Sequence, residues 1–357
     1  MKVVGIFRGF PGLGRVVPGI NILQELQKRE DVQVKIFSYL QGIDLGLISS
    51  YNIETIVRSE DISSIGIIPV SPSGEKIIDE IEKFQPNFVI IDGEPLLVLV
   101  IKLRFPSLKV VVLLNPFDIE NPKNKISSQL FFINCYSKAD VAIVHGLWQI
   151  KKPLCFQNSF YSINTIVRNQ ILEIENANDS KRIVCILGGG TVNSSESFYL
   201  STTTIAEHTI LLADCFPELS FEIFCGNTNI YTYVITKTNS KRNVRVFESI
   251  ENVNTIYNSA KLIISRAGRN TISELLMLNI PALLFATMCD VRGSEQTENI
   301  KRAAVISDKI IGLNIQSDKT TILKTFKKLI SFQQSEIQWH SGNTELINIF
   351  KNELLCI

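Results

Sequence analysis

The residues best suited to chemistry gather between residues 262 and 284. A short apolar run, Leu262 to Ile264, predicts a buried strand, after which the chain turns at Gly268 and enters a helix at about Asn270. A strand, a tight turn and a helix start together place several backbone N–H groups at one point, where anions bind well. The segment therefore predicts an anion site at the tip of a helix.

Three charged side chains surround that point. Arg266 and Arg269 carry guanidinium groups suited to phosphate. Glu274 lies one helical turn after Asn270, so its carboxylate can reach back to the same opening and accept hydrogen bonds from a diol such as a ribose. Together they form a nucleotide-shaped site. An ordinary βαβ unit, in which Gly268 only allows the turn, explains the same pattern without a ligand.

The segment SRAGRNTISELLMLNIPALL resembles the donor-binding signature of GT-B nucleotide-sugar glycosyltransferases. It is similar to the peptidoglycan-precursor N-acetylglucosaminyltransferase family, glycosyltransferase family 28. The resemblance implies that Gly268, Asn270 and Thr271 bind the donor together with the charged residues above. It continues in DVRGSEQTENIKRA, where the family's loop and helix start hold the hydroxyls of the donor sugar; the matching positions are Asp290, Glu295, Gln296 and Asn299.

A glycine-rich turn, GFPGLGR, follows the strand expected at Val3–Phe7 and ends on Gly14 and Arg15. A GxGxxG dinucleotide fingerprint is excluded because position 17 is valine. The resemblance implies instead the GT-B glycine loop over donor diphosphate and acceptor. In many relatives a histidine follows that last glycine and in some it is the catalytic base, whereas Arg15 stays protonated and cannot accept a proton. Arg15 therefore supports phosphate beside another base, marks a loss of activity, or is a solvated loop residue.

A second glycine turn follows the strand expected at Ile183–Leu187 and runs into Thr191. Consecutive glycines let a backbone approach a ligand closely. The resemblance implies a donor-phosphate loop made of Gly189, Gly190 and the hydroxyl of Thr191. It also implies that the backbone of Ile250 reads the uracil of the donor.

Asp92 and Glu94 stand at the carboxyl end of the strand expected at Phe88–Ile91. In open α/β sheets, ligands bind beyond the carboxyl ends of strands, and a carboxylate there could act as general base toward an acceptor hydroxyl or amine. We expect this role of Asp92 first, because several GT-B relatives carry an aspartate at the equivalent strand end. Glu94 and Asp118 are weaker candidates. An equally good alternative is that Asp92 caps the following helix or bonds the turn.

The candidate site residues must be positioned by strands and helices that alternate along the chain. Both halves of the chain alternate near-continuous Val/Ile/Leu strands with helices, which is typical of parallel sheets covered on both faces. We therefore expect an α/β protein of two Rossmann-like, doubly wound domains, and the resemblance implies the GT-B fold with the active site in the cleft between them. The expected domains are 1–168 on the acceptor side, 169–340 for the nucleotide sugar, and a terminal helix in 341–357 that returns to the first domain. The periodicity fades between residues 151 and 181, and we expect the linker near Asn169.

Composition limits the remaining classes. The 357 residues suffice for two domains, and the net charge of +1 gives no reason to expect nucleic acid. Seven scattered cysteines indicate a reducing cytoplasm, and three histidines far apart (145, 208 and 340) predict no metal site. The segment LLVLVIKLRF (96–105) is far shorter than the roughly 20 residues of a spanning helix. It favours a core helix over a face that touches a membrane.

The resemblance thus implies a metal-independent hexosyl- or N-acetylhexosaminyltransferase. It would move a sugar from a UDP-sugar, with inversion, to an acceptor that is a small molecule, a lipid-linked molecule or a peptide. We expect a cytoplasmic location and no cofactor beyond this co-substrate. A peripheral contact with the inner face of the membrane stays open. Two other classes stay open: a nucleotide-sugar 2-epimerase, which needs no acceptor, and a non-catalytic nucleotide-sugar-binding subunit, which the arginine at position 15 would permit.

Overall fold

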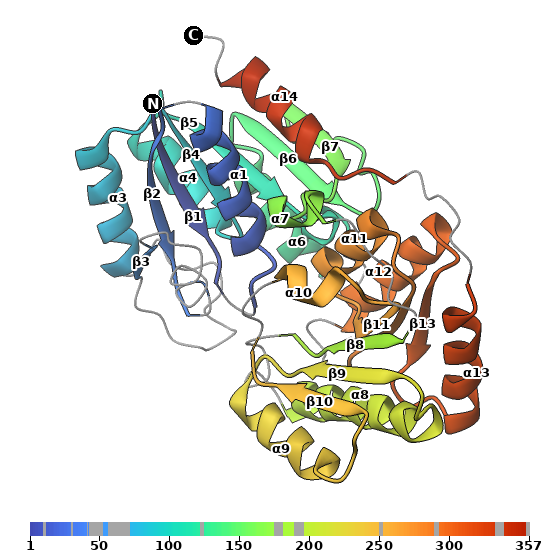
Figure 1. Cartoon of the computed structure of the whole chain (residues 1–357). Coiled ribbons are helices and arrows are strands. Elements are labelled where there is room, and N and C mark those ends of the chain that lie inside the picture. Colours follow the sequence, from blue (N-terminus) through green and yellow to red (C-terminus); the bar gives the residue numbers. More distant parts are fainter. Residues whose placement is uncertain are drawn as a thin grey trace. The chain divides into compact units, whose positions relative to one another are not determined.

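The computed structural model divides the chain into two compact units (Figure 1). Unit 1 comprises Met1–Ile166 and Gly342–Ile357, and unit 2 comprises Val167–Ser341. The structure describes residues 1–9, 12–29, 31–40, 42, 53–55, 72–121, 125–174, 181–188, 196–249, 253–288, 293–332 and 339–354.

Unit 1 is built on a parallel sheet with the strand order β3-β2-β1-β4-β5-β6-β7 among the described residues. Apolar side chains fill most of its central strands, as expected for a sheet covered on both faces. The strands are β1 Lys2–Phe7, β2 Gln33–Ser38, β3 Ile53–Thr55, β4 Phe88–Asp92, β5 Lys109–Leu114, β6 Val141–Gly146 and β7 Ser159–Asn164.

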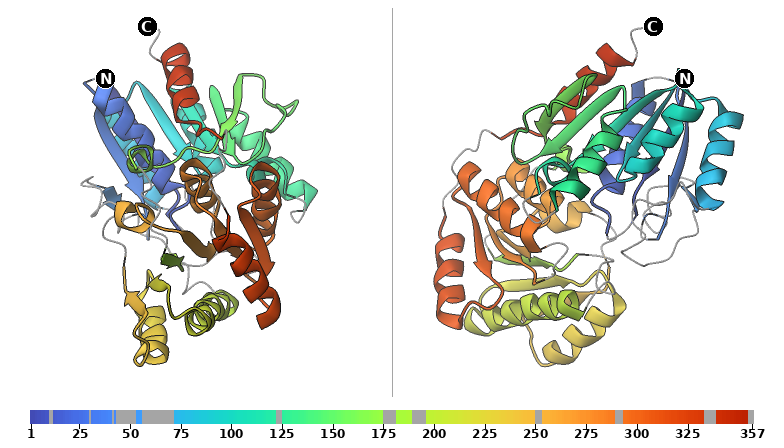
Figure 2. Two further views of the ribbon diagram at one scale, coloured as in Figure 1. Left: turned by 45° about the vertical axis from the view of Figure 1, so that its right-hand side comes forward. Right: turned by 180° about the vertical axis from the view of Figure 1, so that it is seen from behind.

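Helices pack on both faces of this sheet. On one face, α1 (Val16–Arg29) and the terminal helix α14 (Asn343–Glu353) share an apolar cluster with the strands. On the other face lie α3 (Pro72–Phe84), α4 (Pro95–Arg104) and α6 (Ile126–Tyr136), as Figure 2 also shows. The short helix α5, Pro116–Ile119, follows β5. Because α14 buries its apolar side here, the last residues of the chain belong to unit 1.

Unit 2 carries a second parallel sheet, ordered β10-β9-β8-β11-β12-β13. Its strands are β8 Arg182–Ile186, β9 Ser220–Phe224, β10 Val244–Phe247, β11 Leu262–Arg266, β12 Ala282–Ala286 and β13 Ile310–Asn314. Its helices are α7 Asn169–Leu172, α8 Glu196–Cys215, α9 Thr228–Thr238, α10 Val253–Tyr257, α11 Arg269–Leu278, α12 Gly293–Ile306 and α13 Lys319–Ile330.

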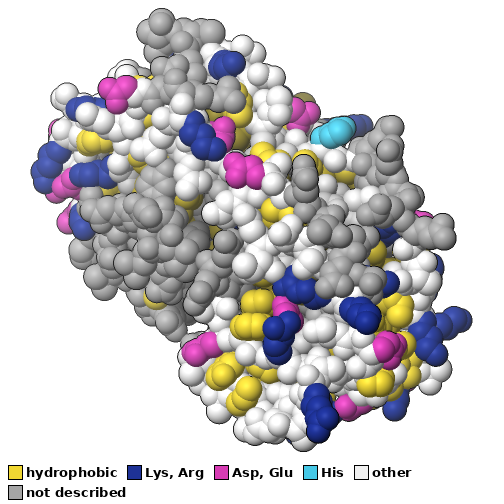
Figure 3. All heavy atoms as spheres, viewed as in Figure 1, with side chains coloured by type: hydrophobic (Ala, Val, Ile, Leu, Met, Phe, Trp, Pro, Cys, Tyr) yellow, Lys and Arg dark blue, Asp and Glu magenta, His cyan; other side chains and the backbone are white. Residues whose placement is uncertain are grey.

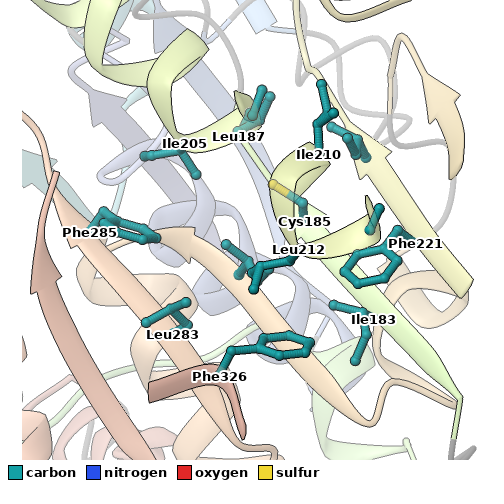
Figure 4. Packing of buried hydrophobic residues seen from close by; sticks show 14 of the residues in the cluster. Ile183, Cys185, Leu187, Ile205, Ile210, Leu212, Phe221, Leu283, Phe285 and Phe326 are labelled. Atoms are coloured by element: carbon teal, nitrogen blue, oxygen red, sulfur yellow. The ribbon is translucent and has the colours of Figure 1, made fainter. Parts of the chain in front are cut away.

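The apolar core of unit 2 lies between the sheet and helices α8, α9 and α13. Figure 4 shows how Phe326 of α13, Phe221 of β9 and Leu283 of β12 converge on one another beneath α8. Helices α11 and α12 lie on the opposite side of the sheet (Figures 1 and 2). On the face of unit 2 that Figure 3 shows, basic and acidic side chains are interspersed.

Both sheets reverse their strand order once, between β1 and β4 in unit 1 and between β8 and β11 in unit 2. This is the doubly wound arrangement, and the prediction of two Rossmann-like α/β domains is confirmed. In such sheets ligands bind beyond the carboxyl ends of the strands at the point of reversal. The two reversal points are therefore the places to look for a site.

Several elements were not expected, among them β7 and α9. β7 lies where the fading periodicity suggested only a linker, and it pairs with β6 along its whole length. As the last strand of the sheet it leaves most of its side chains half-exposed, so it shows no apolar alternation. The helix α9 was not expected because its sequence, TNIYTYVITKT, is rich in β-branched residues; it is held by buried Ile230 and Val234.

The segment 96–105 forms most of α4, and its apolar residues Leu97, Val98 and Ile101 are buried in unit 1. The core interpretation of this helix is confirmed. Within the part of the chain that the structure describes, no helix is both long enough and apolar enough to cross a bilayer.

Candidate functional site

Charged side chains gather where the strand order of unit 1 reverses. Arg8 follows β1, and its backbone N–H donates to the Asp92 carbonyl oxygen over 2.9 Å. Asp92 ends β4, Glu94 follows it, and Asp118 lies in α5 just beyond β5. Arg15 comes from the turn before α1. Residues from four separate segments therefore meet at one edge of the sheet.

Arg15 bridges two of these carboxylates. Its Nη1 donates to Asp92, and its guanidinium also forms a two-pronged pair with Asp118 at 2.6 and 3.0 Å. The side chain of Arg15 is only 13% exposed and that of Asp92 only 1% exposed, whereas that of Asp118 is 16% exposed. Arg15 is therefore not a solvated loop residue, and its charge is already matched by two carboxylates.

The ionisation of this bridge follows from its surroundings. Burial by itself lowers the pKa of Arg15, but the charges of Asp118 and Asp92 raise it well above its usual value. Burial by itself raises the pKa of Asp118, but the charge and hydrogen bonds of Arg15 lower it below its ordinary range. Arg15 and Asp118 are thus held in their charged forms.

Glu94 belongs to a second buried group in the same place. It is fully buried and accepts a hydrogen bond of 2.5 Å from the hydroxyl of Tyr39. Arg8 lies 3.8 Å from Glu94 and donates to the carbonyl oxygen of Gly93. Glu94 is the N-cap residue of α4 but makes no side-chain cap bond, and Asp92 faces Arg15. The alternative in which Asp92 caps this helix is therefore wrong.

Gly93 explains the spacing of Asp92 and Glu94. Its φ of +93° lies in the region that favours glycine. A Cβ at this position would lie 2.6 Å from the Cβ of Arg8 and 2.8 Å from the Cδ of Arg15. Because residue 93 has no side chain, Arg8 and Arg15 can both pack against the backbone between Asp92 and Glu94.

The reversal point of unit 2 lies between β8 and β11, whose residues pair in register. Gly188 follows β8 with a φ of +72°, and a Cβ there would lie 2.0 Å from Nη2 of Arg266. Arg266 ends β11, and its guanidinium lies 4.4 Å from the centre of the Phe198 ring. The guanidinium of Arg266 thus packs between the backbone at Gly188 and the ring of Phe198, at the end of β11.

The helix α11 starts directly behind Arg266. Its N-cap residue is Gly268, which has no side chain to cap the first-turn N–H groups, and Arg269, Asn270 and Thr271 form that first turn. The helix ends at Asn279, which adopts the left-handed conformation. The predicted start and end of this helix are confirmed, and its first turn has the geometry of an anion site.

Glu274 lies on the next turn of α11 and is 1% exposed. Arg168 forms a two-pronged pair with its carboxylate at 2.6 and 2.7 Å, and the hydroxyl of Tyr257 donates to it over 2.7 Å. Burial by itself lowers the pKa of Arg168, but the charge of Glu274 raises it above its usual value. The carboxylate expected to face a ribose is therefore already held by two side chains of unit 2.

The polar residues of α12 hold the ends of neighbouring strands. Oε1 of Gln296 accepts hydrogen bonds from the N–H and the hydroxyl of Thr287, at 2.7 and 2.9 Å. Nδ2 of Asn299 donates to the carbonyl oxygen of Ala267 over 3.2 Å. Glu295, in the first turn of α12, is half-buried. These contacts tie α12 to the loops that follow β11 and β12.

Some predicted residues stand elsewhere. Gly14 is exposed, in the turn before α1. Gly189, Gly190, Thr191, Ile250 and Asp290 lie outside the described residues. Further residues that contact candidate groups were not expected, among them Arg8, Tyr39, Arg168 and Tyr257. Of these, only Arg8 carries a signal in the sequence, as a charge directly after a strand; Arg168 and Tyr257 face Glu274 only because the sheet brings α7, α10 and α11 together.

The lowered pKa of Asp118 makes a prediction for stability. An unfolded aspartate has a pKa of about 3.9, and the pKa of folded Asp118 is lower. The ionised Asp118 therefore makes its full contribution to the free energy of unfolding at pH values above the unfolded pKa. The contribution is lost as the pH falls through the folded pKa. We expect Asp118→Asn to be less stable than wild type at pH 7, with a gap that narrows below about pH 4. Urea unfolding across pH 7 to 3 measures this gap, and a constant gap would contradict the assignment.

Comparison with known proteins places this geometry in a family. Residues 163–348 match the model of the glycosyltransferase family 28 C-terminal domain. A UDP-N-acetylglucosamine–N-acetylmuramyl-(pentapeptide) pyrophosphoryl-undecaprenol N-acetylglucosamine transferase of Thermosipho melanesiensis is 25% identical, over 92% of this chain and 94% of its own.

Two solved structures share the fold at lower identity. MurG of Acinetobacter baumannii is 18% identical with a TM-score of 0.58, covering 93% of this chain and 91% of its own. The UDP-GlcNAc 2-epimerase of Neisseria meningitidis, bound to UDP-GlcNAc, is 16% identical with a TM-score of 0.62, covering 99% and 100%. The family match spans more than half of the chain and contains Gly188, Arg266, Gly268 and Glu274. The chain belongs to glycosyltransferase family 28 and is a glycosyltransferase of the GT-B fold.

Proposed function

We propose that this glycosyltransferase takes its sugar from a UDP-sugar, held by unit 2. The observation that carries the proposal is the meeting of Gly188, Arg266 and Gly268 at the ends of the paired strands β8 and β11. The curated relative is named for UDP-N-acetylglucosamine, and the epimerase of the same fold is bound to it. Both names support uridine as the base of the donor.

The diphosphate of the donor would lie at the first turn of α11. The N–H groups behind Gly268 and the positive end of the helix favour a negative charge there. Arg266 and Arg269 add two guanidinium groups, and the loop Gly189, Gly190 and Thr191 would complete the cradle. These groups can balance the charge of the leaving UDP, so we propose that the transfer needs no metal ion.

The sugar and nucleoside would be held by the side chains around that turn. Glu274 would accept hydrogen bonds from the ribose, and the backbone of Ile250 would read the uracil. The helix α12 would hold the hydroxyls of the sugar through Glu295, Gln296 and Asn299. The last two already bond to Thr287 and Ala267, which fixes where their remaining donors and acceptors point.

Unit 1 would supply the base. The acceptor oxygen or nitrogen attacks the anomeric carbon, the bond to the diphosphate breaks with its electrons on UDP, and the configuration inverts. The proton of the acceptor passes to a carboxylate, and Asp92 is our candidate because it ends β4 at the reversal point of the sheet, where Arg15 pairs with it. Arginine at position 15 would thus orient the base in place of acting as one.

We further propose that the acceptor is lipid-linked, as the name of the Thermosipho relative states for that protein. The helix α6 of unit 1 supports this by exposing the large apolar side chains Ile126, Leu130 and Phe131, with Lys125 exposed directly before it. Apolar side chains with a cation at their edge fit the surface of a bilayer with anionic lipids.

The donor site is tested by titration calorimetry against UDP-, dTDP- and GDP-sugars. We expect one UDP-sugar to bind, and Glu274→Gln to weaken that binding at least about 10-fold, because hydrogen bonds to a charged group contribute about 1.5 to 3 kcal/mol. Glu298→Gln is the matched control, since this glutamate pairs only on the surface of α12 with Lys301 and Arg302. If no nucleotide sugar binds wild type, the donor proposal is wrong.

The base is tested by UDP release from the bound UDP-sugar, with the undecaprenol-linked acceptor of the relatives present. We expect Asp92→Asn to slow release about 100-fold or more while donor affinity is kept, because a positioned base contributes about that factor. Asp140→Asn, which breaks the pair with Lys102, is the control. Full turnover in Asp92→Asn would exclude this base. An epimerised donor without UDP release would indicate an epimerase, and binding without reaction a binding subunit.

The membrane contact is tested by sedimentation with vesicles that contain anionic phospholipid. We expect wild type to sediment with them and Leu130→Glu/Phe131→Glu to remain in the supernatant, because two charges replace exposed apolar side chains on α6. Val305→Glu, at an exposed apolar residue on α12 of unit 2, is the control. Equal sedimentation of all three proteins would contradict the contact.

A further inference from the structure

The carboxylate of Glu274 has little hydrogen-bonding capacity left. Arg168 donates to both of its oxygens, and Tyr257 donates to Oε2. A carboxylate offers about four acceptor positions. The three bonds therefore leave about one position, and they also fix the plane in which it points.

Tyr257 comes from the last residue of α10, and that end of the helix is anchored by Arg182. Nη2 of Arg182 donates to the carbonyl oxygen of Thr255 over 2.6 Å, and Nη1 of Arg182 donates to the carbonyl oxygen of Ile256 over 3.0 Å. Nη1 also lies 3.2 Å from the hydroxyl oxygen of Ser259. One guanidinium thus binds the end of α10 on both sides of Tyr257.

Arg182 is in turn held by Glu222 on the neighbouring strand β9. Its Nε and Nη2 donate to Oε2 of Glu222 over 2.9 and 2.6 Å, and both side chains are largely buried. Arg245 contacts the other oxygen of Glu222 at 2.7 Å from the exposed side of β10. A continuous series of contacts therefore runs from the sheet through Arg182 and α10 to Glu274.

We propose that Tyr257, anchored by Arg182, is a positioning residue that turns the remaining acceptor position of Glu274 toward one ribose hydroxyl. Tyr257 thereby sets how strongly the protein distinguishes a ribonucleotide from a 2′-deoxyribonucleotide. The inference rests on the proposed function, in which Glu274 faces the ribose. Without the Tyr257 hydroxyl, Arg168 still holds both oxygens, but Oε2 has one more acceptor position that water can take, so a ligand that uses its hydroxyl loses more affinity than one that lacks it.

The test is the ratio of dissociation constants for 2′-deoxy-UDP and UDP, measured by titration calorimetry. We expect this ratio to exceed one in wild type and to fall about 2- to 10-fold in Tyr257→Phe, the range of one net hydrogen bond. Arg182→Lys should lower it in the same direction, because a single ammonium cannot bind Glu222 and the carbonyls of α10 in the same geometry. A change in folding stability alone would not move this ratio.

Two controls match these variants. Tyr233→Phe removes the hydroxyl that bonds to Glu207 on α8, and Arg245→Ala removes the exposed partner of Glu222; both should keep the wild-type ratio. An unchanged ratio in Tyr257→Phe would overturn the inference alone. Should that variant fail to fold, the ratio in Arg182→Lys decides in the same way. A wild type that binds UDP no better than 2′-deoxy-UDP would overturn the role of Glu274 itself and with it the inference.

Discussion

In each sheet, the strand order reverses between two neighbouring parallel strands, and the candidate residues depend on that single constraint. Parallel strands end at one edge, and at the reversal the following segments leave in opposite directions, so a site opens between them. In unit 1 this edge joins Arg8, Asp92 and Asp118; in unit 2 it joins Gly188, Arg266 and the first turn of α11. The rest of each unit, its helices and apolar clusters, keeps these strands in register.

Charges brought together at such an edge must be compensated, because an isolated buried charge is very costly. Unit 1 meets this requirement with Arg15 between Asp92 and Asp118, and with glycine at position 93 so that the arginines can approach. An arginine where many relatives carry histidine is therefore consistent with a working site. In the proposed inverting transfer, Asp92 accepts the proton and Arg15 orients it, so the two roles belong to different side chains.

Unit 2 solves a related problem in another way. Its proposed anion site is a backbone feature, the first turn of α11. Glu274, by contrast, is a buried carboxylate and is matched by Arg168 and Tyr257. The same contacts that make its burial tolerable also restrict how it can meet a ribose. The stability of the free protein and the selectivity for the donor would thus depend on the same hydrogen bonds.

The sequence by itself determined the features that depend on neighbouring residues. Apolar runs predicted the central strands, and Gly268 and Asn279 predicted the ends of α11, because these signals act within one turn or one strand. The edge strand β7 and the β-branched helix α9 were missed, because contacts in the folded unit outweigh their weak local pattern. Only the tertiary structure decided two of the charge pairs. Arg15 pairs with Asp118, 103 positions away, and Arg168 pairs with Glu274, 106 positions away. Local periodicity says which side of an element a residue occupies, whereas the order of strands in the sheet decides which charge it meets.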